Sequence, residues 1–306
     1  MELEIWGDSM LESEWFRDLE PRLARCRIYS IGDRATNPDH IEHLILYDRP
    51  DIILCCNGVP VLVLEKTREV PTGHNIGQRL GRIVRALECN TPALTLLPFR
   101  ARKHGLHTGI CEINVRVLRM AIRMGTLHET PCLFIRWPVD AHGELVGDGS
   151  EAPGLRGLVE HSIDHGLELS AAPVVSTLEQ MEDHARSIEV ARASYVTPPA
   201  SVEVRSAPRA VGRAGHRTVC IYTIEMTPAA CRRQDPYTGM QFLYDYLYCR
   251  DGTDVANKHT ALVLHFPRLT QSQFVSANPN DPLRKSSLWY ATANELWFSD
   301  GEIVLR

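Results

Sequence analysis

The sequence has no long hydrophobic run and no excess of charge of one sign. Nowhere do about 18 apolar residues follow one another, so we expect no membrane-spanning helix. Lys and Arg number 33 against 38 Asp and Glu, a formal net charge of -5 that excludes a protein coating nucleic acid through its overall charge. With 44% hydrophobic and 23% charged residues, the composition is typical of a folded globular protein.

The nine cysteines form no recognisable pattern. There is no C-x-x-C motif and no His pair at a matching interval, so the spacing gives no support to a structural zinc site. Cys55 and Cys56 are adjacent in an apolar segment and are interpreted as core residues. The first residues, MELEI, have neither the basic flank nor the apolar core of a secretory signal, and we expect a reduced, cytoplasmic protein.

Two motifs of other enzyme classes are also missing. Without a G-x-x-x-x-G-K-[ST] loop, the chain has no ATPase motor of its own. Without a Gly-x-Ser-x-Gly elbow, a hydrolase of small metabolites is only a minor alternative.

The clearest structural signal is an apolar hairpin at residues 51–66. The segments DIILCC and VPVLVLEK are joined by Asn57-Gly58, a dipeptide that accepts the positive φ angles of a tight turn. Both segments are almost continuously apolar, which predicts strands covered on both faces.

The rest of the chain predicts an α/β protein with a mixed central sheet. We expect a core at residues 1–140, a loop-rich connection at 141–217 with an Arg-rich linker at 197–215, and a C-terminal α/β extension at 218–306 for DNA recognition or dimerisation. Within the core, periodicity predicts a helix at 9–26, strands at 27–31 and 44–47, the hairpin, a helix at 76–88, a strand at 93–99, a helix at 113–124 and a strand at 131–139.

Two carboxylates mark the open end of the hairpin. Pairing of the two strands brings Asp51, where the first begins, close to Glu65, near the end of the second. Alternation along the strand places Glu65 and Thr67 on one face and Lys66 on the other. The carboxylates would repel each other unless a divalent cation lay between them, and hard oxygen ligands suit Mg²⁺.

These residues resemble the core hairpin of the PD-(D/E)XK nucleases. Arg49-Pro50-Asp51, the Asn-Gly turn and a returning strand that ends at Glu65 are especially similar to the nuclease domain of type I restriction enzyme motor subunits. In that family a helix with a Gln follows, and Gln78 stands at a comparable place. The resemblance covers about the first third of the chain, to residue 139 at most, and it implies a restriction-endonuclease-like αβββαβ core.

The resemblance also implies an activity. The chain would be a magnesium-dependent endonuclease acting on double-stranded DNA, with Mn²⁺ as a substitute, of the type II restriction or a related defence class. Asp51 and Glu65 would hold the metal, and Lys66, Thr67 and Gln78 would complete the catalytic site. A homodimer is expected, because a two-fold dimer cuts both strands of a symmetric site.

One position departs from the family pattern. The family has Lys two residues after the Glu, where this chain has Thr67, and Lys66 lies one place early. Three alternatives follow: a bulge rotates Lys66 into the site, another base such as Lys103 or His74 serves, or the site is inactive. The last would leave a nuclease-like module that binds DNA or a protein partner.

Basic residues near this site are candidates for DNA binding. The stretch 99–108 contains basic residues and no acidic one, so its positive charge is concentrated locally, although a solvated loop is an equal alternative. Arg82 lies four residues after Gln78 on one helix face, so both could face the hairpin, whereas a surface ion pair is the simpler interpretation of Arg82 alone. The proposed phosphate-contacting residues are Arg100, Arg102, Lys103 and His104.

Overall fold

A mixed α/β architecture is present in the computed structural model, which describes residues 2–32, 37–70, 74–104, 108–191, 201–223, 260–277 and 293–305. The chain divides into two units, Met1–Asn75 with Arg82–Ala193 and Ile76–Gly81 with Ser194–Arg306. The expected boundaries at residues 140 and 217 differ from these, because the helices that follow residue 154 belong to the first unit.

The first unit is built on a six-stranded sheet with the order β2-β1-β3-β4-β5-β8. The third strand in sequence, β3, runs antiparallel to both neighbours, whereas β4, β5 and β8 are mutually parallel and β1 is parallel to β2. The carboxyl ends of β1, β4 and β5 therefore share one edge of the sheet with the start of β3. The strands are β1 Leu3–Gly7, β2 Arg27–Ser30, β3 Ile52–Cys56, β4 Val59–Lys66, β5 Ala93–Leu97 and β8 Cys132–Arg136.

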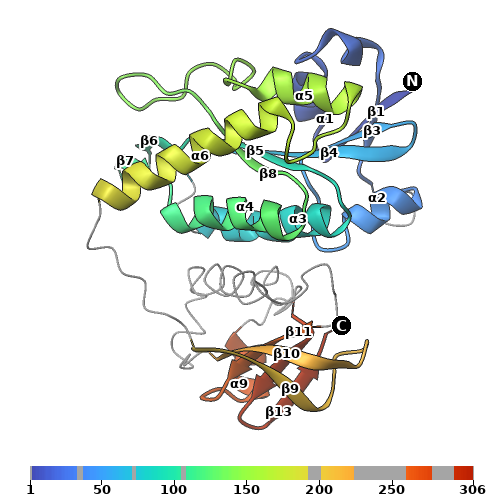
Figure 1. Ribbon diagram of the computed structural model, residues 1–306, viewed down its shortest axis with the longest axis vertical. Helices are drawn as coiled ribbons and strands as arrows, with labels where there is room; N and C mark the ends of the chain where they lie inside the picture. Colours follow the sequence, from blue (N-terminus) through green and yellow to red (C-terminus); the bar gives the residue numbers. More distant parts are fainter. Residues whose placement is uncertain are drawn as a thin grey trace. The chain divides into compact units, whose positions relative to one another are not determined.

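Helices cover both faces of this sheet (Figure 1). Helices α1 and α5 lie on one face and α3 and α4 on the other, while α6 contacts both β8 and α4. Apolar residues at helical spacing cause this packing: in α3, Leu80, Ile83, Val84 and Leu87 are all buried. The helices are α1 Met10–Arg17, α2 Asp39–Leu44, α3 His74–Glu88, α4 Val115–Leu127, α5 Leu155–Asp164 and α6 Ala172–Ala191.

The predicted hairpin is confirmed as β3 and β4, with a detail that the sequence did not reveal. Asn57 and Gly58 both have positive φ angles, 51° and 75°, as the tight turn requires. The pairing is Cys55 with Pro60 but Leu54 with Leu62, so one residue of β4 is bulged out. Continued from Ile52↔Leu64, this shifted register places Asp51 opposite Glu65.

The segment before the hairpin differs from the expected order. The first element is a strand, β1, which was not predicted, and it lies between β2 and β3 in the sheet. The expected helix at 9–26 is the two-turn α1 followed by a 3-10 helix, η1 Pro21–Arg25, because Pro21 lacks the N–H that would continue an α-helix. The expected strand at 44–47 is the end of α2 and a turn.

Two further expected loops contain strands. The basic stretch after β5 forms an antiparallel ribbon of β6 Arg100–Lys103 and β7 Gly109–Glu112. The expected Arg-rich linker at 197–215 contains a strand that belongs to the sheet of the second unit, so the linker prediction was wrong where the structure describes it. Its arginines misled the prediction, because their alternation with small apolar residues suits an edge strand equally well.

The second unit contains a five-stranded sheet with the order β13-β12-β11-β10-β9. The strands predicted at 218–225 and 261–266 correspond to β10 and β11, which pair in parallel. Val211, Val219, Ile221, Ala261 and Val263 form its buried cluster. The elements are β9 Ser201–Val211, β10 His216–Thr223, β11 Thr260–Phe266, α9 Gln271–Ala277, β12 Glu295–Phe298 and β13 Gly301–Val304.

Candidate functional site: a carboxylate pair at the sheet edge

The candidate site lies at the edge of the first sheet where β4 ends and β3 begins. The loop after β1 is fixed there, because the Asp8 amide donates to the carbonyl of Asp51 over 3.1 Å. Gly7 has no side chain at the point where α1 passes closest: a Cβ there would overlap the hydroxyl of Ser13. This edge therefore brings together residues from β1, α1, β3 and β4.

Asp51 and Glu65 are brought together as predicted. The backbone amide of Asp51 donates to Glu65 Oε1 over 3.0 Å, and the amide of Lys66 donates to Asp51 Oδ2 over 2.7 Å. The Glu65 side chain is fully buried, and that of Asp51 is 16% exposed. Each carboxylate thus accepts a hydrogen bond from a backbone amide at or beside the other acidic residue, and these two bonds fix the orientation of both side chains.

A guanidinium already contacts both carboxylates. Arg82 Nη1 lies 3.0 Å from each oxygen of Glu65 and 3.5 Å from Asp51 Oδ1. The other edge of the same group binds Asp48 Oδ2, with Nε at 2.8 Å and Nη2 at 2.6 Å. The Arg82 side chain is only 18% exposed, so the interpretation of Arg82 as a surface ion pair was wrong, and the expectation that it faces the hairpin is confirmed.

Burial controls the electrostatics of this cluster. It raises the pKa of the Glu65 carboxyl to about 8, against the positive charge of Arg82, which lowers it. Burial by itself lowers the pKa of Arg82, but Glu65 and Asp48 more than compensate and raise it. The ionised form of Glu65 therefore depends on a cation beside it.

Lys66 points away from this cluster. Its Nζ lies 3.6 Å from the ring centroid of Trp15 in α1 and 5.5 Å from that of Trp137, whereas Glu65 contacts α3. Burial lowers the pKa of Lys66. The pairing of Lys66 with Leu96 in β5 is regular. The alternative in which a bulge rotates Lys66 into the site is therefore wrong.

Thr67 follows the last residue of β4, where alternation predicts the Glu65 side of the strand. It is 4% exposed, and its hydroxyl accepts a hydrogen bond from the amide of Glu69 over 3.3 Å. Gln78 belongs to α3, as expected, and its side chain lies outside the described residues, as does that of His74.

The proposed DNA-binding residues lie on the β6–β7 ribbon and just after β6. All four are exposed, but two of them are engaged by a neighbouring loop. Arg102 Nε donates to the carbonyl of His142 over 3.1 Å, and His104 Nε2 lies 2.9 Å from Glu144. For the side chains of Arg100 and Lys103, the described part of the chain shows no such contact.

The donor set of the pair suits a hard divalent cation. Among the described residues no group of three or more His, Cys, Asp or Glu is arranged to hold a metal ion. Mg²⁺ commonly takes only one or two carboxylates from a protein and completes its shell with water and substrate phosphate, so Asp51 and Glu65 fit it. Arg82 would compete with the ion, because its guanidinium contacts oxygens of the same two carboxylates.

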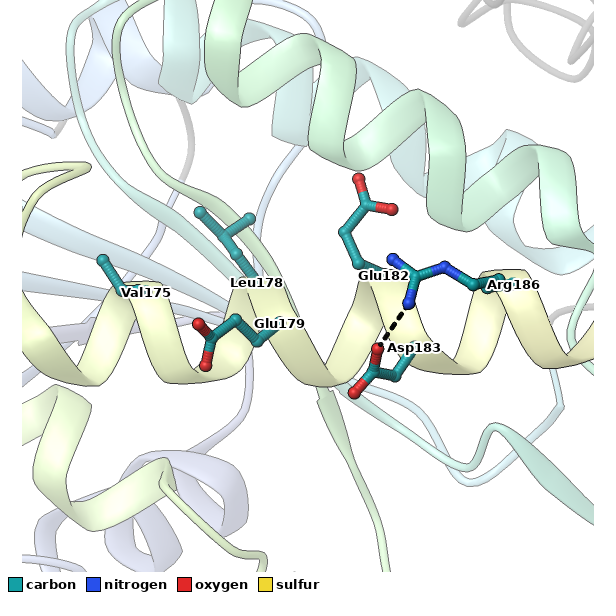
Figure 2. Close-up of a pocket in the computed structure, with 6 residues that line it drawn as sticks. All are labelled: Val175, Leu178, Glu179, Glu182, Asp183 and Arg186. Atoms are coloured by element: carbon teal, nitrogen blue, oxygen red, sulfur yellow. Dashed lines mark hydrogen bonds and ion pairs between the residues drawn. The ribbon is translucent and has the colours of Figure 1, made fainter.

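A hollow on the surface of α6 is a different kind of feature (Figure 2). Its residues come from this one helix, and Figure 2 shows Glu182 turned toward a neighbouring helix. Glu182 is bonded to Arg119 of α4, and Asp183 pairs with Arg186 at 3.2 Å. Glu182 thus links α6 to α4, Asp183 and Arg186 pair within α6, and the hollow contains none of the predicted site residues. The lining residues are Val175, Leu178, Glu179, Glu182, Asp183 and Arg186.

Two contacts at the end of the hairpin were not predicted from the sequence, one made by Asp48 and one by Trp15. Asp48, three residues before Asp51, binds Nε and Nη2 of Arg82. An acidic residue so close to the start of β3 was the one sequence signal for this contact. Trp15 was assigned only to the apolar stripe of the first helix, although it also supports the Lys66 ammonium group.

Comparison with protein-family models, with curated proteins and with solved structures gave no match. Among the described residues, every helix is too short or too polar to cross a lipid bilayer.

Proposed function

We propose that this chain is a magnesium-dependent endonuclease that hydrolyses phosphodiester bonds of double-stranded DNA, of the type II restriction or a related defence class. The observation that carries the proposal is the interlocked pair of Asp51 and Glu65 at the end of the hairpin. Two carboxylates held this rigidly by backbone amides form a preorganised site for a hard cation.

In the proposed reaction Asp51 and Glu65 hold Mg²⁺, with Mn²⁺ as a substitute. The bound ion would lower the pKa of a water molecule and neutralise charge on the phosphate. Thr67, which alternation predicts on the Glu65 side of the strand, would take the place of the family lysine and can orient water only as a neutral hydrogen-bond partner. Lys66 belongs to the packing of α1 in this proposal, because its ammonium group lies on Trp15.

DNA would be held by charge near this edge. Arg100 and Lys103 are exposed on the ribbon that follows β5 and are the first candidates for phosphate contacts, with affinity that falls as salt rises. A homodimer would place two such sites on opposite strands.

A cleavage assay tests the proposal. Purified protein should nick and linearise plasmid DNA with Mg²⁺ or Mn²⁺ and not with EDTA. Asp51→Asn should reduce the rate to below about one hundredth of wild type, the loss expected when a group that stabilises the transition state is removed. Asp183→Asn, the same chemical change on an exposed ion pair of α6, is the matched control and should cleave normally. Thr67→Ala should reduce cleavage more than Lys66→Met.

A second function is favoured by one observation. Arg82 contacts the oxygens that a metal would need, and an arginine in that position could replace the metal permanently. The chain would then be an inactive nuclease-like module that binds DNA or a protein partner. Absence of nicking with either metal, by protein that still retards DNA on a gel, would support this function and exclude the endonuclease.

A further inference from the structure

We infer that Arg82 is an internal cation that competes with divalent metal for Asp51 and Glu65, so that metal binds only by displacing one nitrogen of the guanidinium. The inference rests on the proposed metal site and concerns what controls its occupancy. It makes Arg82 a positioning residue, because it acts through the two carboxylates.

The contacts leave no room for both cations on the same oxygens. Nη1 is equally distant, 3.0 Å, from the two oxygens of Glu65 and also reaches Asp51 Oδ1. A magnesium ion requires its oxygen ligands at about 2.0 to 2.1 Å. An ion bridging Asp51 and Glu65 would therefore meet Nη1 at close range, with like charges facing each other in a buried site.

The far side of the guanidinium explains how the exchange can occur. Nε and Nη2 are both bound to Asp48, whose side chain is 31% exposed. When Nη1 leaves the pair, the guanidinium therefore keeps a carboxylate partner at the protein surface and does not become an unpaired buried charge. Asp48 thus serves as the anchor that lets Arg82 release the pair without leaving the site.

This arrangement also explains how a buried carboxylate is kept ready for metal. Glu65 is fully buried, and both of its oxygens face a cation at 3.0 Å. Arg82 supplies that cation while no metal is bound. The cost is weaker metal binding, because the metal must replace an existing interaction.

The test measures metal binding by the full chain without DNA. Isothermal titration with Mn²⁺ alone should show that Arg82→Met binds about ten-fold or more tightly than wild type, within the usual range for coupling between two ligands of one site. The thermal unfolding temperature of Arg82→Met should also depend strongly on Mn²⁺, because the metal then supplies the positive charge that Arg82 provided beside the two carboxylates. Adding Asp51→Asn to Arg82→Met should abolish the gain.

Arg85→Met is the matched control. Arg85 lies in the same helix and is 6% exposed, and it binds the carbonyl of His43 at 2.7 Å and Glu88 at 3.1 Å. Its loss removes a guanidinium that is more buried than that of Arg82 and has other partners than the carboxylate pair, so metal affinity should stay at the wild-type value.

If Arg82→Met does not fold, Arg82→Lys provides the same test. Lysine keeps a positive charge but lacks the planar fork that spans Asp48 and the pair together, so metal affinity should still exceed that of wild type. Equal Mn²⁺ affinity in wild type and in whichever Arg82 variant folds, or an equal gain in Arg85→Met, would overturn the inference. Because no DNA is present, this result is independent of cleavage: the competition can fail in an active nuclease, and it can hold in a chain that does not cleave.

Discussion

Replacement of Glu295 by Gln should destabilise the second unit in a way that depends on pH. Glu295, in β12, is 1% exposed, and its two oxygens accept four hydrogen bonds. Oε1 accepts from Arg209 Nη1 at 3.1 Å and from the amide of Gly212 at 2.7 Å, and Oε2 from Arg209 Nη2 at 2.8 Å and from the Trp297 indole at 2.7 Å. A carboxylate accepts all four, whereas an amide group accepts at one end only.

The magnitude follows from the bonds that are lost. The NH₂ group of Gln must face two donors, one of them a nitrogen of Arg209 and the other a neutral N–H. A charged hydrogen bond contributes about 1.5 to 3 kcal/mol and a neutral one about 1 kcal/mol. Arg209 is 43% exposed and keeps Glu302 as a partner, so water and Glu302 offset part of the loss. We expect a decrease of about 2 to 3 kcal/mol in the free energy of unfolding at pH 7.

The pH dependence has a definite sign. Burial by itself raises the pKa of Glu295, but hydrogen bonds from Arg209, Gly212 and Trp297 outweigh it, so the folded-state pKa is lowered. A lowered carboxyl pKa stabilises the folded state above the unfolded value of about 4.3, and this stabilisation is lost as the pH falls through the folded value. The difference between wild type and Glu295→Gln should therefore shrink on acidification from pH 7 to pH 3.

Hydrogen exchange of the β12 amides, followed by mass spectrometry across this pH range, isolates the second unit from the first. Glu302→Gln is the matched control, because Glu302 is 45% exposed and also pairs with Arg209, and it should cost less than about 1 kcal/mol. A loss in Glu295→Gln that is the same at pH 3 and pH 7, or no greater than that in Glu302→Gln, would refute the account of Glu295 as a buried charged acceptor.

Two further predictions concern the first unit. Gly7→Ala should lower the free energy of unfolding of this unit by about 1 to 3 kcal/mol, because the new Cβ overlaps the Ser13 hydroxyl. In urea unfolding, adding Ser13→Ala should recover most of this loss, and failure to recover it would mean that the backbone of β1 is the obstacle. Lys66→Met should cost about 0.5 to 2 kcal/mol through loss of the ammonium group above Trp15, whereas a gain in the same urea assay would mean that burial of the charge outweighs the ring contact.

The hairpin and its two carboxylates were determined by the sequence. Asn57-Gly58 between two apolar runs left few alternatives to a tight turn, because few residue pairs tolerate two positive φ angles. Alternation along β4 then predicted Glu65 and Thr67 on one face and Lys66 on the other, and the placements of Glu65 and Lys66 are confirmed. Local chemistry sufficed here because turn type and side-chain alternation depend on residues close together in the chain.

The exact meeting of Asp51 and Glu65 was decided by the tertiary structure. A two-residue turn without irregularity would place Asp51 opposite Leu64, and the bulge between the pairs of Leu54 and Cys55 shifts the register by one residue. A shift of one residue reverses which face a side chain occupies, so this detail governs whether the carboxylates converge. No local pattern marks the bulge, since it depends on how β4 fits between β3 and β5.

The partners of the pair were likewise beyond the sequence. Periodicity placed Arg82 on a helix face but could not distinguish a solvated arginine from one that is buried against Glu65, because that depends on the packing of α3 on the sheet. Asp48 reaches the site from a loop, Trp15 of α1 contacts Lys66, and β1, which was not predicted, lies between β2 and β3 in the sheet. The sequence by itself determined the acidic hairpin, and long-range packing decided which cation stands beside it, because contacts between distant segments leave no periodic signal in the chain.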